Sequence, residues 1–274
     1  MQKLHSYIFI VIILFISTAL FQGCTDDTVT GPSTGPDVSG LIKLAKADAL
    51  GARANVTLYL EDSLHTGYNK VYAVVYDSLT GNLITDAHVI PSLVDHNLGG
   101  PVEYAPEEAI DGKFPFALIF IESQSDDPMH WGIKIGIHNH GAAGEPYGTA
   151  TFGDLVIKEN AGKFQTKSLG DGATLYMSYI NPKTPVTGLN NFEFLINKSY
   201  DTSYYAVDTS YAINLKPVLI SSGASSTGNI NPMPAGDLRH YTGKINLTSR
   251  GAWRINMYMT KVGYSDSTYF DVSF

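Results

Sequence analysis

The chain has 274 residues, of which 44% are hydrophobic and 16% charged, and its formal net charge is −8. This length suits one large domain or two of about 120 residues. An acidic chain has no long-range attraction for nucleic acid, so the sequence predicts no nucleic-acid partner. Cys24 is the only cysteine, which excludes disulfides and zinc–thiolate sites, and 17 tyrosines and 12 phenylalanines favour strands over helices.

Residues 1–23 predict a secretory signal peptide. Lys3 provides a basic start and a long apolar run follows from Tyr7. The alternative is a transmembrane anchor. The apolar run ends at Phe21, so it is shorter than the roughly 20 residues that a membrane-spanning helix needs. The segment Phe21-Gln22-Gly23-Cys24 resembles the lipobox of bacterial lipoproteins, which implies a lipid on Cys24 and a contact with the membrane through that lipid. Without the signal peptide the formal charge becomes −9, because one lysine and no acid are lost.

Residues 24–39 predict a flexible linker, because they are rich in Gly, Pro, Ser and Thr and have no apolar periodicity. Asp26-Asp27 resembles an export signal of surface lipoproteins. We therefore expect a lipid-anchored protein of the bacterial cell envelope, at the outer membrane, on its periplasmic face or at the cell surface.

Residues 40–161 predict a first β-sandwich. Apolar residues alternate with polar ones or glycine in several short segments, which is the period of a half-buried strand. The clearest segments are 56–60, 71–75, 114–120 and 131–137. Turn signals such as Thr80-Gly81-Asn82 separate them, and no window has a helical period.

Residues 162–274 predict a second copy of the same unit. Thr66-Gly67-Tyr68-Asn69 recurs as Thr187-Gly188-Leu189-Asn190, and Trp131 recurs as Trp253, each about 120 residues later. In the second copy, apolar and polar residues alternate in segments 211–215, 253–259 and 270–274. Six or seven short strands and one tryptophan per copy predict an all-β chain of two tandem immunoglobulin-like antiparallel β-sandwiches.

The repeated motifs also resemble a known family. Thr-Gly-x-Asn, Tyr241-Thr242-Gly243-Lys244, Gly251-Ala252-Trp253 and the closing segment 270–274 are similar to the YtkA-like domain, which is related to the FixH and CopC-type envelope sandwiches. The resemblance covers most of 187–274 and, more loosely, 66–157. It implies copper handling by methionines and histidines in a loop marked by a proline. The matching stretches here, 91–96 and 217–223, contain no methionine and one histidine, His96.

Histidines favour a metal site in the first copy. Six of the seven histidines after the signal lie there. His138-Asn139-His140 ends a predicted strand, so both imidazoles project outward and can share a cation. Together with His96 they form our candidate site for copper or another transition metal. The alternative is ordinary surface histidines.

No catalytic motif is present in the sequence, so we expect a non-enzyme without a resident cofactor. Met257 and Met259 share the parity of Trp253 and are expected in the core. Tyr68, Tyr204 and Tyr205 are candidates for stacking on a sugar. The sequence therefore predicts a non-enzymatic envelope protein that binds or scaffolds an unidentified envelope partner, with copper or other transition-metal handling as the alternative.

Overall fold

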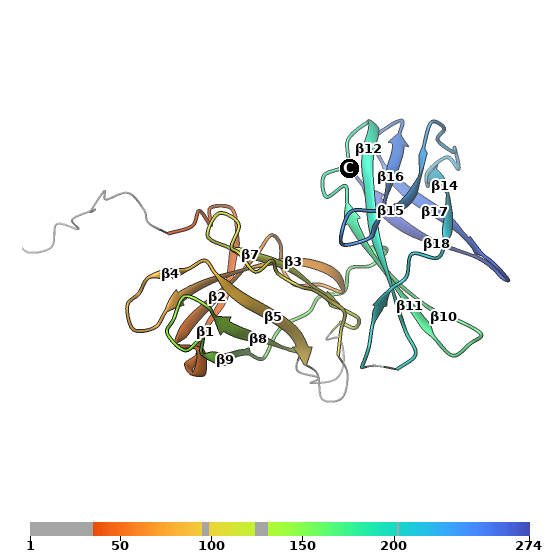
Figure 1. The fold of residues 1–274 in the computed structure, drawn as a ribbon. Coiled ribbons are helices and arrows are strands. Elements are labelled where there is room, and N and C mark those ends of the chain that lie inside the picture. The colour runs from red at the N-terminus through yellow and green to blue at the C-terminus, as the bar shows by residue number, and fades with distance from the viewer. Residues whose placement is uncertain (1–34, 95–98, 124–130, 202) are drawn as a thin grey trace, which may run out of the picture. The chain divides into compact units, whose positions relative to one another are not determined.

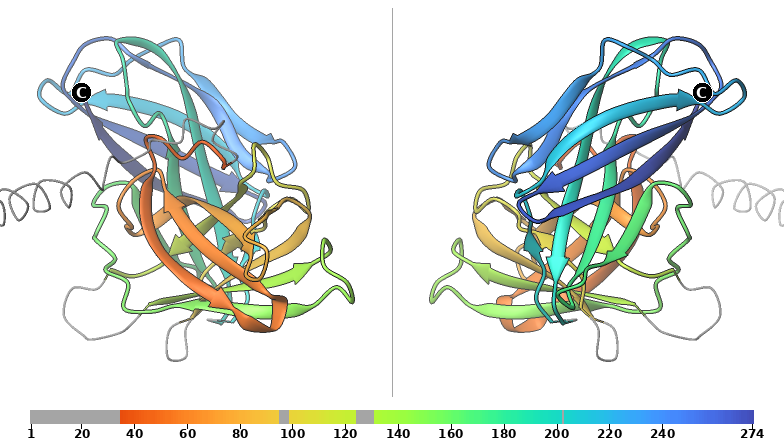
Figure 2. Two further views of the ribbon diagram at one scale, coloured as in Figure 1. Left: turned by 90° about the vertical axis from the view of Figure 1, so that its left-hand side faces the viewer. Right: turned by 90° about the vertical axis from the view of Figure 1, so that its right-hand side faces the viewer.

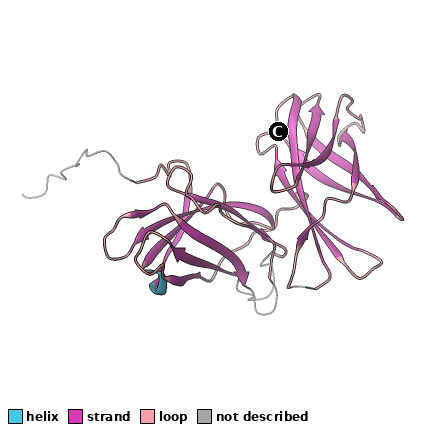
Figure 3. Ribbon diagram, in the orientation of Figure 1, coloured by secondary structure: helices cyan, strands magenta, loops and turns pink. Residues whose placement is uncertain are grey.

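Strands make up almost all of the regular structure (Figures 1 and 3). The computed structural model describes residues 35–94, 99–123, 131–201 and 203–274. Leu50–Ala52 forms a short 3-10 helix between the first two strands. Within the described ranges, no helix has the length and apolar character needed to cross a membrane. The predicted signal peptide, Cys24 and His96 lie outside the described residues.

The first sandwich consists of two antiparallel sheets. The larger has the order β1-β2-β3-β7-β6, with β4 paired to β3, and the smaller has the order β5-β8-β9. With β2 as the first strand, this is the ABED and CFG arrangement of an immunoglobulin domain, preceded by β1. The strands are β1 (Ile42–Ala49), β2 (Ala54–Leu60), β3 (Gly67–Asp77), β4 (Leu83–Ile84), β5 (Ala87–Val94), β6 (Val102–Glu103), β7 (Phe114–Phe120), β8 (Gly132–Asn139) and β9 (Tyr147–Phe152).

The second sandwich repeats this topology strand for strand. Figure 2 shows its strands, coloured from green to blue, in two further views. Its larger sheet has the order β10-β11-β12-β16-β15, with β13 paired to β12, and its smaller sheet has the order β14-β17-β18. The strands are β10 (Phe164–Ser168), β11 (Thr174–Asn181), β12 (Gly188–Ser199), β13 (Ala206–Val207), β14 (Ala212–Leu219), β15 (Ile230–Ala235), β16 (His240–Leu247), β17 (Ala252–Lys261) and β18 (Tyr264–Ser273). The predicted fold class is therefore confirmed. The predicted boundary between residues 161 and 162 lies between β9 and β10.

Among the residues that the structure describes, each half has nine strands, where the sequence predicted six or seven. The difference includes β4, β6 and β13, which have two residues each. Such short strands cannot display a period of two, so hydrophobic alternation does not reveal them.

Alternation along the strands builds two separate cores. In β8, Ile133, Ile135 and Ile137 are fully buried, whereas Lys134 between them is exposed. Trp131 lies just before this strand and packs edge-on against Phe120, with 5.3 Å between the ring centroids. The second core has Trp253 at 1% exposure, and Met257 and Met259 are fully buried on the same face of β17. The two methionines are core residues, as expected.

The repeated Thr-Gly-x-Asn motif closes a loop at the start of a strand. Gly67 adopts a φ of 87° and Gly188 one of 103°, which is the left-handed region that glycine enters without steric cost. The side chain of Asn69 donates to the carbonyls of His65 and Gly67, at 2.7 and 2.8 Å, and accepts from the backbone N–H of His65 at 3.0 Å. Asn190 makes the same three bonds at 2.8–2.9 Å. The motif therefore has a structural role in both copies.

The two sandwiches also contact each other. Residues from Pro36 to Phe274 form one compact unit. Ile119 of the first sandwich packs with Ile180 and Leu195 of the second in a third, smaller apolar cluster. A polar pocket and a bridge between buried charged side chains also lie at this joint.

Candidate functional site

Three histidines of the first sandwich converge on one patch, which we call the histidine cluster: His88, His138 and His140. His88 of β5 lies directly opposite His138 of β8 in the sheet register. His140 follows the end of β8. One ring nitrogen from each of the three lies within 4.8 Å of the other two. The strand period explains the arrangement, because the neighbours of His138 in β8 point into the core and leave its ring on the outer face.

Each imidazole of the histidine cluster also contacts one carboxylate. Nε2 of His88 lies 2.9 Å from Glu107, and Nδ1 of His140 lies 2.8 Å from Asp86. Nε2 of His138 lies 3.7 Å from Glu145. The histidine side chains are 22–40% exposed, so the patch is partly desolvated and open to solvent.

Backbone hydrogen bonds hold two of these acids in place. The N–H of Ala87 donates to the carbonyl of Glu107 at 3.1 Å, and the N–H of Ala109 donates to the carbonyl of Thr85 at 2.8 Å. The segment that carries Glu107 therefore runs beside the start of β5. The cluster therefore places three imidazoles close together, each beside one carboxylate.

The structure brings together two of the three predicted ligands. His138 and His140 lie side by side, with 4.8 Å between their ring centroids. His96 lies outside the described residues, so its place in the site stays a prediction. The third histidine of the cluster is His88, which sequence reasoning missed because the β5–β8 register was not known.

The loops expected from the family resemblance are strands in the structure. Pro91 lies within β5 opposite Ile135, and Pro217 lies within β14 opposite Ile255. Both strands are at the edge of their sheets, where the missing N–H of proline breaks no ladder bond. Residues 92–94 and 218–223, the described parts of the two stretches after these prolines, contain no histidine or methionine.

A buried carboxylate–imidazole bridge joins the two sandwiches. It consists of Glu103 on β6, His240 on β16 and Glu193 on β12. Nε2 of His240 lies 2.5 Å from Oε1 of Glu103, and its Nδ1 lies 2.6 Å from Oε1 of Glu193. The side chains of Glu103 and His240 are each 7% exposed. Tyr68 donates to the second oxygen of Glu103 at 2.8 Å, and Asn181 donates to Glu193 at 2.6 Å.

The bridge holds His240 in its charged form. Burial lowers the pKa of His240, but the hydrogen bonds to Glu103 and Glu193 outweigh it and raise the pKa to about 9. The hydrogen bond from His240 lowers the pKa of Glu193. At neutral pH one imidazolium therefore lies between two carboxylates. Sequence reasoning missed this site, although His240 is the only histidine of the second copy.

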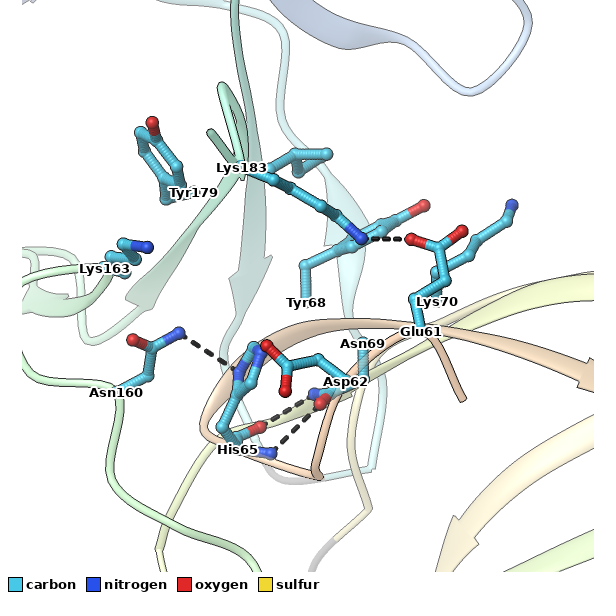
Figure 4. Close-up of a pocket in the computed structure, with 11 residues that line it drawn as sticks. Glu61, Asp62, His65, Tyr68, Asn69, Lys70, Asn160, Lys163, Tyr179 and Lys183 are labelled. Atoms are coloured by element: carbon cyan, nitrogen blue, oxygen red, sulfur yellow. Dashed lines mark hydrogen bonds and ion pairs between the residues drawn. The ribbon is translucent and has the colours of Figure 1, made fainter. Parts of the chain in front are cut away.

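A polar pocket of about 400 Å³ opens at the same joint (Figure 4). Lys183 of the second sandwich forms an ion pair with Glu61 of the first across this pocket. His65 lies 3.2 Å from Asn160, and burial lowers its pKa, so its ring is neutral at pH 7. The ion pair of Lys183 with Glu61 makes the pocket part of the joint between the sandwiches.

The tyrosines proposed for sugar stacking are only partly available. Tyr68 uses its hydroxyl on Glu103 and its ring lies edge-on to His240. The hydroxyl of Tyr205 donates to the carbonyl of Gly99 at 3.0 Å. Tyr204 is 72% exposed, so it alone of the three presents most of its surface.

Comparisons with known proteins add little to this picture. No protein-family model and no curated protein matches the chain. Domains 5–6 of the S-layer protein SbsC are 8% identical, over 85% of this chain and 98% of that one, with a TM-score of 0.31. A conserved domain protein from Bacillus anthracis is 12% identical, over 85% and 90%, with a TM-score of 0.32. The Escherichia coli adhesin FdeC is 19% identical, over 84% and 66%, with a TM-score of 0.27. Similarities at this level carry no argument about function, so the sites themselves must carry it.

Proposed function

We propose that this chain is a non-enzymatic, lipid-anchored protein of the bacterial cell envelope, whose two sandwiches act as one stiff module that presents a binding surface away from the membrane. The lipobox-like segment ending at Cys24 and the polar linker after it support the anchor and the tether.

The carboxylate–imidazole bridge is the observation that carries the stiff module. Breaking a buried ion pair is strongly unfavourable, because the charge left behind has lost both water and partner. Separation of the sandwiches would break the ion pair of His240 with Glu103, whose side chains are each 7% exposed in the joined state. The apolar contact of Ile119 with Ile180 and Leu195 adds burial of the same joint. The ion pair and the apolar contact both favour movement of the two sandwiches as one body.

Stiffness is tested by ¹⁵N relaxation of the chain from residue 25 onward. We expect both sandwiches to give one rotational correlation time, because they tumble as a single body. His240→Gln should allow the two halves to move separately. Two correlation times in the unchanged protein would contradict the stiff module.

The anchor is tested by metabolic labelling with an alkyne analogue of palmitate, followed by membrane fractionation. We expect the unchanged protein to be labelled and recovered with membranes, and Cys24→Ala to be unlabelled, because Cys24 is the only thiol in the chain. Label on the Cys24→Ala variant would contradict anchoring at this residue.

Transition-metal binding is the second candidate function, and the histidine cluster is the observation that favours it. It is compatible with a scaffold and needs no contribution from the second sandwich. Its chemistry is developed below.

A further inference from the structure

We propose that His88, His138 and His140 form a binding site for a divalent transition-metal ion, Zn²⁺ or Cu²⁺, on the outer face of the first sandwich. The site is independent of the lipid anchor and of the joint between the sandwiches. It differs from the predicted set in its third ligand, which is His88.

The spacing of the ligands is close to what a metal requires. Zinc–nitrogen bonds of about 2.0–2.1 Å at tetrahedral angles place ligand nitrogens about 3.3 Å apart. The nitrogens of the cluster lie within 4.8 Å of one another, so the largest gap exceeds that spacing by about 1.5 Å. Rotation of partly exposed side chains closes such a gap without moving the strands. Because β5 and β8 are paired at this position, the backbone under two of the ligands is already in place.

The acids around the cluster supply the outer shell that metal-bound histidines usually have. A ligating imidazole generally donates its second N–H to a carboxylate or carbonyl, which fixes the tautomer and orients the ring. Glu107, Asp86 and Glu145 each approach one nitrogen of one histidine. In this arrangement the other nitrogen of each ring would bind the metal. Three carboxylates also make the local potential negative, which favours a cation.

The donor set selects the class of metal. Imidazole nitrogens suit Zn²⁺ and Cu²⁺, whereas Ca²⁺ and Mg²⁺ require oxygen ligands. Three protein ligands leave a fourth position for water. No thiol contributes, so oxidation of cysteine cannot destroy the site.

Isothermal titration calorimetry of the full chain, purified in detergent, tests the site with Zn²⁺, Cu²⁺ and Ca²⁺. We expect one Zn²⁺ or Cu²⁺ ion to bind at micromolar concentration or tighter, and no binding of Ca²⁺. The triple variant His88→Ala, His138→Ala, His140→Ala should lose this binding. Asp86→Asn should weaken it about 10- to 100-fold, the usual effect of removing a carboxylate behind a ligating histidine.

Ser92→Ala is the matched control, because Ser92 is exposed on the same face of β5 and its hydroxyl donates to the carbonyl of Lys134. It should bind metal like the unchanged protein. Circular dichroism and urea unfolding in a chelator should be alike for all variants, so that a loss of binding is not a loss of fold.

Two results would overturn the proposal. One is the absence of saturable Zn²⁺ and Cu²⁺ binding in the unchanged protein. The other is binding that survives in the triple variant, which would place the site on other residues. Either result leaves the relaxation and labelling experiments on the stiff, anchored module unaffected.

Discussion

Replacement of His240 should cost several kcal/mol of folding free energy. His240→Gln removes the imidazolium and leaves the carboxylates of Glu103 and Glu193 facing each other, with Glu103 only 7% exposed. Loss of one member of a buried ion pair typically costs about 3–5 kcal/mol. The pKa of His240 gives a similar figure, because its rise from 6.5 to about 9 corresponds to about 3 kcal/mol at about 1.4 kcal/mol per unit. Out of a total stability of about 5–15 kcal/mol, this is a large fraction.

The same argument predicts how stability depends on pH. The folded-state pKa of His240 is raised above its unfolded value, so its stabilisation is complete below about pH 6.5 and is lost as pH rises through about 9. The folded-state pKa of Glu193 is lowered, so its stabilisation is present above the unfolded pKa of 4.5 and is lost as pH falls further. The bridge is therefore strongest between these limits, and the alkaline loss should disappear in His240→Gln.

Urea unfolding followed by tryptophan fluorescence measures both effects, because each core contains one tryptophan, Trp131 in the first and Trp253 in the second. Lys244→Ala, at an exposed position of the same strand, is the matched control and should change stability by less than about 0.5 kcal/mol. Adding Glu103→Gln to His240→Gln should recover part of the loss, since it removes a buried charge. A loss below about 1 kcal/mol for His240→Gln, or no difference in alkaline stability from the unchanged protein, would refute the charged bridge.

Three further predictions concern the cores and the joint. Asn69→Ala and Asn190→Ala should each cost about 1–3 kcal/mol in urea unfolding, because each strips several backbone groups of their partners; a negligible loss in both would contradict the loop-closing role. Trp131→Ala should lower the free energy of unfolding by about 3–5 kcal/mol, and Trp131→Phe should lower it less, with the same order at Trp253. Equal losses for the Phe and Ala variants would contradict a role of aromatic ring packing in the cores. Lys183→Ala should lower the free energy of unfolding by less than about 1 kcal/mol, because its side chain is 53% exposed. A larger loss, measured by calorimetry, would show that the Lys183–Glu61 pair is a main stabilising contact between the sandwiches.

The fold could be predicted from the sequence because its signals are local and repeated. The alternation around Ile133, Ile135 and Ile137 specifies a strand and the face it buries, whatever lies opposite. Thr-Gly-x-Asn and the single tryptophan of each copy recur at a nearly constant spacing, which is sufficient to recognise a duplication. Two-residue strands and the prolines of the edge strands escaped prediction, because their structure depends on neighbours in the sheet.

The sites depended on contacts that no local pattern contains. The outward parity of His138 and His140 was visible in the sequence, but the approach of His88 follows from the register of β5 on β8. His240 lies 137 residues from Glu103 and 47 from Glu193 along the chain, and only the packing of one sandwich on the other brings the three together. Strand periodicity determines which face of a strand is buried. Which charges meet across two sheets or two domains is decided by tertiary packing alone, because it is a property of the assembled surfaces.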